Sequence, residues 1–318
     1  MATGRVTYVT GKWVPEEEAS MHIYDSGFMF SSGVFDMFRT FNRVPFLIDE
    51  HIERLFMSMR AFYYDIDKTA GEIKKICYEA MHLNAHLFIN DEYRFMINVT
   101  RGPLAIYKDV FTLADGEQWG KNSWIVNAWP LSKTAKTLAH FYITGANAVI
   151  VAQRQIPAQF LDPKVKSRSR AHYDIANIQA SKYGRDAQAL LLDDDGFVCE
   201  GTGANFIIVK GGTLIVPEQR NMLRGCSMAY VLDVLAPQIG LSVVEKNIEP
   251  YDVLESSEAF FTGTFTNLIP CNRLNGQFLK GMQGRDGPMG PVTKLICDTW
   301  SNNVGIDVVG QIKEWSRT

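Results

Sequence analysis

The spacing of apolar residues predicts both strands and helices in the first part of the chain. Residues 33–41 alternate between two sets of side chains, which is the period of a strand. Residues 52–62 instead carry apolar side chains at helical spacing, and Asp49 suits the N-cap of that helix. The same patterns predict a strand at 6–9, a helix over 70–87, and strands at 93–100 and 123–128.

The second part of the chain continues this mixture of elements. It opens with an apolar run at 148–151, and a helix is expected over 171–183. The turn at 194–196, Asp-Asp-Gly between two apolar stretches, is typical of a β-hairpin. Pro291 suits the first turn of a last long helix. Because the elements lack the regular βαβ alternation of a doubly wound sheet, the predicted fold class is α+β.

Length and the weakening of the pattern predict two domains. A chain of 318 residues is long enough for two cores of ordinary size. The periodicity weakens between Pro130 and Gly145. We therefore expect a smaller N-terminal α/β domain at 1–131, a connection at 132–147 and a larger C-terminal domain at 148–318.

Composition and charge exclude several classes of protein. Apolar residues make up 46% and charged residues 21%, as in ordinary globular proteins, and a formal charge of −3 gives no overall attraction to nucleic acid or acidic membranes. No apolar run approaches the roughly 20 residues that span a bilayer, and the N-terminus has no apolar signal-peptide core. The five cysteines are scattered and form no CxxC pair, so neither disulfides nor a metal site is expected, and a reducing cytoplasm fits best.

Two residues 34 positions apart suggest a chemistry. Lys166 lies just before the expected helix, and Glu200 ends the predicted hairpin, followed by small residues at 201–204. An enzyme that uses pyridoxal 5′-phosphate (PLP) needs a lysine that forms a Schiff base with the cofactor. It also needs a carboxylate that keeps the pyridinium nitrogen protonated. Lys164 is the alternative lysine.

The basic run that contains Lys166 also has a plainer interpretation. Lys164, Lys166, Arg168 and Arg170 could form a solvated or nucleic-acid-facing patch. The overall acidity of the chain and the lack of interleaved aromatic residues argue against nucleic acid.

Short motifs in a fixed order raise the lysine and glutamate above chance. They are ASMHIYDSGF (19–28), SGVFD (32–36), EHIERL (50–55), NVTRG (98–102), EGTGAN (200–205), LRGCS (223–227), TGT (262–264) and GPVT (290–293). In these motifs, over nearly its whole length, the chain resembles the class IV family of PLP enzymes, which includes branched-chain and D-amino acid aminotransferases. The resemblance implies the two-domain fold type IV, with a β-barrel-like C-terminal domain, and an expected homodimer.

The resemblance also implies which residues bind the cofactor. Lys166 would carry PLP and move a proton as general base and acid, while Glu200 would pair with the ring nitrogen. Arg54 would bind the phosphate through its guanidinium fork. Cys226 and Ser227 would bind it at the start of a helix, where free N–H groups favour an anion, and Thr264 could add a hydroxyl.

The chain departs from the family at two cofactor and substrate positions. Many relatives have a tyrosine five positions after the lysine, bonded to the ring oxygen of the cofactor. Here that position is Ala171, so either Tyr173 takes the role from the next turn or the role is unfilled. Phe265 stands where branched-chain enzymes usually have a small residue, and its ring would reshape the substrate pocket.

Other residues are expected to bind the substrate. Arg101 resembles the arginine that holds the substrate carboxylate in the D-amino acid branch, with Arg94 and Arg39 as alternatives. Phe35 and Asp36 resemble pocket-lining strand residues. The expected activity is transfer of an amino group between an amino acid or amine and a 2-oxo acid. The alternatives are an aminodeoxychorismate-lyase-like elimination and an (R)-amine transaminase.

Overall fold

The computed structural model describes residues 4–113 and 117–317. The chain divides into two compact units, and the first comprises residues 1–131 together with 165–169. The second comprises residues 132–164 and 170–318. The short segment 165–169, which the sequence analysis placed in the C-terminal domain, is thus counted with the first unit.

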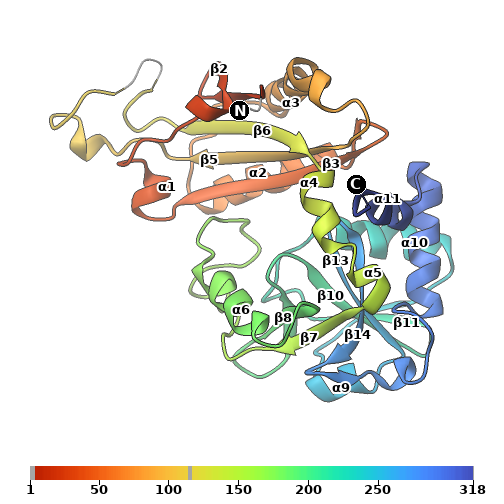
Figure 1. Cartoon of the computed structure of the whole chain (residues 1–318). Coiled ribbons are helices and arrows are strands. Elements are labelled where there is room, and N and C mark those ends of the chain that lie inside the picture. The colour runs from red at the N-terminus through yellow and green to blue at the C-terminus, as the bar shows by residue number, and fades with distance from the viewer. Residues whose placement is uncertain (1–3, 114–116, 318) are drawn as a thin grey trace. The chain divides into compact units, whose positions relative to one another are not determined.

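The first unit is built on an antiparallel sheet of six strands in the order β2-β1-β6-β5-β3-β4 (Figure 1). The strands are β1 (Val6–Val9), β2 (Lys12–Pro15), β3 (Gly33–Phe41), β4 (Val44–Pro45), β5 (Tyr93–Thr100) and β6 (Ser123–Pro130). Its helices are α1 (Ser26–Met29), α2 (Ile48–Ala61) and α3 (Ala70–Asn84). The strand patterns read from the sequence at 6–9, 33–41, 93–100 and 123–128 are therefore confirmed.

The start of α2 corrects one expectation. The helix begins at Ile48, and its N-cap is Leu47, which adopts a left-handed backbone with φ of 54°. Asp49 is not the N-cap but lies in the first turn, where its negative charge still favours the positive end of the helix dipole.

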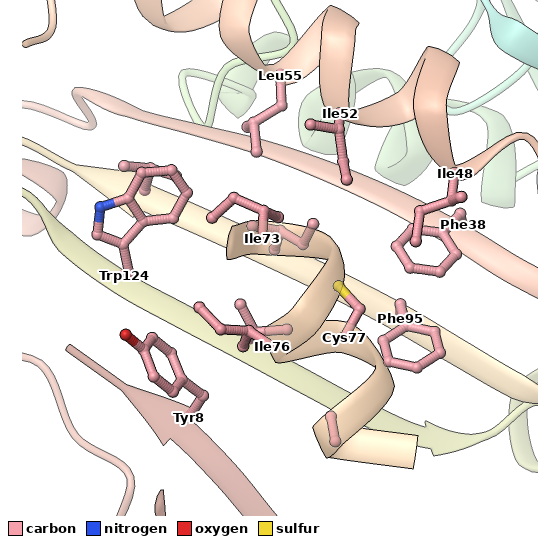
Figure 2. Close-up of a cluster of buried hydrophobic side chains, with 14 of the residues drawn as sticks. Tyr8, Phe38, Ile48, Ile52, Leu55, Ile73, Ile76, Cys77, Phe95 and Trp124 are labelled. Atoms are coloured by element: carbon pink, nitrogen blue, oxygen red, sulfur yellow. The ribbon is translucent and has the colours of Figure 1, made fainter. Parts of the chain in front are cut away.

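The core of the first unit lies between the sheet and the helices α2 and α3. Figure 2 shows side chains of both helices meeting side chains of the strands, among them Ile52 and Leu55 from α2 and Phe38 from β3. Trp124 of β6 is only 1% exposed. Burying an apolar side chain of this size contributes about 1.5–3 kcal/mol, so this cluster fixes α2 on the strand β3.

The second unit contains a sheet of nine strands that closes on itself. Its order is β12-β11-β10-β13-β14-β7-β8-β9, with β15 beside β14, and β9 pairs in turn with β10 (Figure 1). The strands are β7 (Ala146–Ile150), β8 (Ala187–Leu192), β9 (Val198–Gly201), β10 (Asn205–Lys210), β11 (Thr213–Val216), β12 (Val243–Glu245), β13 (Glu258–Gly263), β14 (Asn267–Leu274) and β15 (Gln277–Phe278). Closure of the ring agrees with the barrel-like domain that the family resemblance implied.

Helices complete the second unit. They are α4 (Ser132–Ala135), α5 (Phe141–Thr144), α6 (Ala171–Ser181), α7 (Cys226–Ala229), the π-helical segment Tyr230–Leu235, α8 (Ala236–Gln238), α9 (Pro250–Leu254), α10 (Pro291–Val304) and α11 (Val308–Trp315). Pro291 occupies the first turn of α10, as its sequence position predicted. In the described ranges, no helix combines the length and the apolar character needed to cross a membrane.

Candidate functional site

The backbone of Lys166 is held by the first unit. Its segment forms an isolated antiparallel bridge to β3 between Val34 and Ser167. The Phe35 N–H donates to the Lys166 carbonyl at 2.9 Å, and the Lys166 N–H donates to Ser58 Oγ of α2 at 3.1 Å. Because the N–H and the carbonyl of Lys166 both form hydrogen bonds, the position of its Cα atom is fixed.

The two candidate lysines have different surroundings. Lys166 Nζ lies 5.1 Å from the centroid of the Phe35 ring, and the guanidinium of Arg168 lies 3.9 Å from the same centroid. Lys164 Nζ instead forms a salt bridge with Asp162, at 2.8 Å from Oδ1. The Lys164 amine is thus engaged by a carboxylate.

Arg54 is part of a buried ionic cluster in the first unit. Its Nε and Nη2 donate to the two carboxylate oxygens of Asp36, each at 2.8 Å, and His51 Nδ1 lies 2.7 Å from Asp36 Oδ1. Burial alone would raise the pKa of Asp36, but the charges and hydrogen bonds of Arg54 and His51 hold that pKa well below its usual range. Asp36 is therefore ionised, and it fixes one edge of the Arg54 guanidinium.

This cluster corrects the expectation that Asp36 lines a substrate pocket. Consecutive residues of a strand point to opposite faces of its sheet, so Asp36 shares its face with Val34 and Phe38. That face packs against α2, and Asp36 is fully buried. Its carboxylate consequently acts on Arg54.

Glu200 lies in a network of hydrogen bonds in the second unit. It is on β9 and 3% exposed. Its Oε1 accepts bonds from Gln155 Nε2 at 2.8 Å, from Tyr173 Oη at 2.8 Å and from the Leu223 N–H at 3.2 Å. Its Oε2 accepts a bond from Asn205 Nδ2 at 3.3 Å. Hydrogen bonds donated to a carboxylate favour its ionised form, so the network stabilises a negative charge at this position.

The Tyr173 hydroxyl forms hydrogen bonds with two side chains of this network. Its hydroxyl donates to Glu200 Oε1 and accepts from Gln155 Nε2 at 3.0 Å. Burial, with the nearby charge of Glu200, raises the pKa of Tyr173 well above its usual value. The phenol is therefore neutral and serves as a donor to Glu200.

Two of the expected phosphate-binding residues of the second unit lie at the start of α7. Gly225 is the N-cap, and Cys226 and Ser227, both buried, form the first turn. A Cβ atom at Gly225 would lie 2.1 Å from Asn205 Oδ1, so a larger residue does not fit there. Thr264 follows the end of β13 and is partly buried. N–H groups in the first turn of a helix have no partner within the helix, and they can bind an anion.

The expected substrate residues lie in different settings. Arg101 is exposed, donates through Nη2 to the Phe62 carbonyl, and lies 5.3 Å from the centroid of the Tyr64 ring. Arg39 is buried over Phe41, and burial lowers the pKa of Arg94 to about 10. Phe265 is partly buried in the second unit.

One cavity of about 440 Å³ lies in the first unit, next to the segment that carries Lys166. Residues of the first loop, the start of β3, the end of β5 and Arg168 line it. Neither Phe35 nor Arg101 is among the described residues of its lining. The polar side chains of its lining are His22, Asn98, Thr100 and Arg168. Arg168 Nε also donates to Asn98 Oδ1 at 2.9 Å.

Sequence reasoning missed two residues of the Glu200 network. Asn205 was quoted within the motif at 200–205 but given no role, and its side chain proves to contact Glu200. Gln155 lies 45 positions before Glu200, in a stretch without periodicity, and no sequence signal pointed to it.

Comparisons with known proteins show the family to which the chain belongs. The family model "Amino-transferase class IV" matches residues 33–274. The chain is 32% identical over 297 residues to a putative branched-chain-amino-acid aminotransferase of Methanocaldococcus jannaschii, covering 93% of this chain and 95% of the relative. It is 26% identical over 299 residues to the D-alanine aminotransferase of Bacillus licheniformis, covering 92% and 95%.

A solved structure shows the same fold. The branched-chain aminotransferase of Thermoproteus uzoniensis, solved with norvaline, superposes with a TM-score of 0.79 at 24% identity, covering 98% of this chain and 97% of that one. The predicted fold type IV is therefore confirmed, as is the family resemblance. The chain belongs to the class IV aminotransferases.

Proposed function

We propose that this enzyme transfers an amino group between an amino acid and a 2-oxo acid, with PLP as its cofactor, Lys166 as the residue that holds it, and Glu200 as the partner of its ring nitrogen. The observation that carries this proposal is the convergence of hydrogen-bond donors on the buried Glu200 carboxylate. A carboxylate in this setting suits a protonated ring nitrogen.

The residues present fit the cofactor at both of its charged ends. When bound, PLP supplies an aldehyde for the lysine and a protonated ring that withdraws electrons from the reacting carbon. Glu200 would pair with the ring N–H. The Arg54 fork, oriented by Asp36, and the first turn of α7 would bind the phosphate, with Thr264 adding a hydroxyl.

Lys166 would have two roles in the reaction. Its amine would bind the cofactor covalently and would be released by the amine of the substrate. The released amine would then take the proton from the substrate Cα and return it to the cofactor C4′, as general base and general acid. The hydrogen-bonded backbone of Lys166 would fix the point from which its side chain moves this proton.

For the substrate, we propose an amino acid whose carboxylate is bound by Arg101, with Phe35 and Phe265 limiting the space for its side chain. One observation favours an alternative, the transamination of amines without a carboxylate. The Arg101 guanidinium already donates to the Phe62 carbonyl, and a substrate would have to compete with that bond. A screen of both enantiomers of amino acids and of 1-phenylethylamine, with pyruvate and 2-oxoglutarate as acceptors, separates the two.

Two further parts of the proposal concern the oligomeric state and the cellular location of the enzyme. Ile23, Phe28 and Phe30 of the first unit are exposed apolar side chains, as in a surface that a second copy covers, and we propose a homodimer. The five cysteines are free, buried thiols, which suits a reducing cytoplasm. Size-exclusion chromatography with light scattering tests the oligomeric state.

The cofactor lysine is tested by substitution. Lys166→Ala should abolish the borohydride-reducible bond to PLP and essentially all turnover, because no other amine would be in place. Mass spectrometry of the reduced, digested wild-type protein should find the label on Lys166. The matched control is Lys164→Ala, which should keep both properties. Loss of labelling in Lys164→Ala and its retention in Lys166→Ala would show that the register is wrong.

A further inference from the structure

Gln155 is a buried polar residue whose backbone is fixed in the second unit. It follows β7 in an irregular segment, is 2% exposed, and its N–H donates to the Leu192 carbonyl at 3.0 Å. Its side-chain Oε1 accepts a bond from the Ile156 N–H at 3.0 Å. A backbone N–H can only donate, so this bond determines which end of the amide is oxygen.

The orientation of Gln155 sets the direction of the whole network. Its Nε2 has two protons, and Tyr173 Oη and Glu200 Oε1 each accept one. Tyr173 consequently uses its own proton on Glu200 Oε1. Asn205 is oriented in the same way, because its Nδ2 donates to the Leu223 carbonyl at 2.7 Å as well as to Glu200 Oε2.

The arrangement disfavours a protonated Glu200. Its Oε1 accepts three hydrogen bonds, and its Oε2 accepts one from Asn205 Nδ2. Each donor stabilises the carboxylate more than the neutral acid, so the network makes Glu200 a weaker base toward a bound pyridine nitrogen. A proton shared between Glu200 and a bound pyridine ring would therefore stay on the ring nitrogen.

We propose that Gln155 is a positioning residue that keeps this shared proton on the ring nitrogen, by donating to Glu200 directly and by directing the Tyr173 hydroxyl toward it. The inference rests on the proposed function. Without the Gln155 donors, the Glu200 carboxylate would attract the proton more strongly. The neutral ring that results would be a poorer electron acceptor, and the proton transfer at Lys166 would slow.

The test compares Gln155→Leu with Gln153→Leu. The Gln153 side chain lies two residues away in the same segment and donates to the Arg154 carbonyl, so its loss controls for removal of an amide. We expect Gln155→Leu to lower kcat by about 10- to 100-fold, with a smaller change in KM and in PLP affinity. In the substrate-free enzyme, the ring-nitrogen NMR signal of isotope-labelled PLP should move toward that of neutral pyridine. Gln153→Leu should resemble the wild type in all of these.

A second variant keeps the test decisive if Gln155→Leu folds poorly. Gln155→Glu has nearly the same shape, but it donates to Glu200 only when its own carboxyl is protonated. Burial and the charge of Glu200 raise the pKa of such a group. The kcat of Gln155→Glu relative to wild type should therefore rise as the pH falls. A residue with a merely structural role would give parallel pH profiles.

The outcomes separate this inference from the proposed function. A wild-type protein that binds no PLP would overturn the proposed function and this inference with it. If the wild type is active, a wild-type kcat in Gln155→Leu would overturn the inference alone. The same holds for a lowered kcat with an unchanged ring-nitrogen signal, or for parallel pH profiles in Gln155→Glu.

Discussion

Two buried carboxylates, Asp36 in the first unit and Glu200 in the second, both lie on strands and both accept several hydrogen bonds, yet the donors are of different kinds. Those on Asp36 include the guanidinium of Arg54 and the imidazole of His51, besides the neutral Met37 N–H, which donates to Oδ1 at 2.7 Å. The four described above for Glu200 come from neutral groups: two amides, a phenol and a backbone N–H.

The kind of donor determines what each carboxylate can do. A cation that bonds to Asp36 stabilises its charge and also cancels much of it, so the product is a fixed, nearly neutral cluster that orients Arg54. The four neutral donors stabilise the charge of Glu200 and, unlike a cation, bring no opposite charge of their own. Glu200 is thus suited to pair with a cationic ligand group, and Asp36 to hold a side chain in place. Removal of the charge should therefore lower the rate of catalysis at Glu200 and the stability of the fold at Asp36.

The largest effect is expected when Glu200 loses its charge. Glu200→Gln keeps the shape of the side chain, but the neutral amide no longer favours a protonated ring nitrogen. Removing an electrostatic stabiliser of this kind costs about 100- to 1000-fold in kcat. PLP should still bind, although the melting temperature should fall, because the amide nitrogen of the new side chain would face a donor of the network. Steady-state kinetics and a PLP titration of the same preparation measure this. Near-normal kcat in Glu200→Gln would erase the distinction between the two carboxylates.

The strongest predictions from sequence concerned residues with a defined motif around them. The pairing of a lysine with a carboxylate pointed to Lys166 and Glu200, the family motifs pointed to Arg54, and the fold class followed from the mixed periodicities. The position of Asp36 against α2 could also have been predicted. Alternate residues of a strand lie on the same face, so Asp36 shares its face with the apolar Val34 and Phe38. It was missed because the resemblance drew attention to the opposite role.

Other features depended on contacts that no local pattern records. Gln155 reaches Glu200 across 45 positions from a segment without periodicity. The bridge between Ser167 and Val34 likewise joins an irregular segment to the start of β3, so the segment 165–169 belongs to the first unit. Such pairings come from tertiary packing, and a single sequence does not encode them in its spacing.

The next effect concerns the other side of the Arg54 guanidinium. If Asp36 orients Arg54 for an anion, Arg54→Ala should weaken PLP binding by about 10- to 100-fold, because a charge-assisted hydrogen bond is worth about 1.5–3 kcal/mol. The control is Arg60→Ala, an exposed arginine in the last turn of the same helix. Titration of the apoenzyme with PLP gives both affinities. Equal affinities in the two variants would assign Arg54 to the stability of the cluster alone.

The third effect, which isolates the Asp36 cluster, is a change in acid stability rather than in activity or cofactor binding. The pKa of Asp36 in the folded protein lies well below its ordinary value of 3.8, because Arg54 and His51 outweigh the burial that would raise it. A lowered carboxyl pKa contributes stability that is complete above about pH 4 and is lost as the pH falls toward the folded value. One such group changes the free energy of unfolding by about 1.4 kcal/mol per pH unit in that range.

Asp36→Asn removes this contribution and leaves Arg54 without its carboxylate. At neutral pH the variant should be less stable than the wild type by about 3 kcal/mol, the usual cost of breaking a buried ion pair. As the pH falls below about 4, the wild type loses its advantage, so the two melting temperatures should converge. Thermal melts of both apoproteins from neutral to acid pH measure this. A constant gap between the two curves would mean that Asp36 owes its role to shape rather than to charge, and that the contrast with Glu200 is not electrostatic.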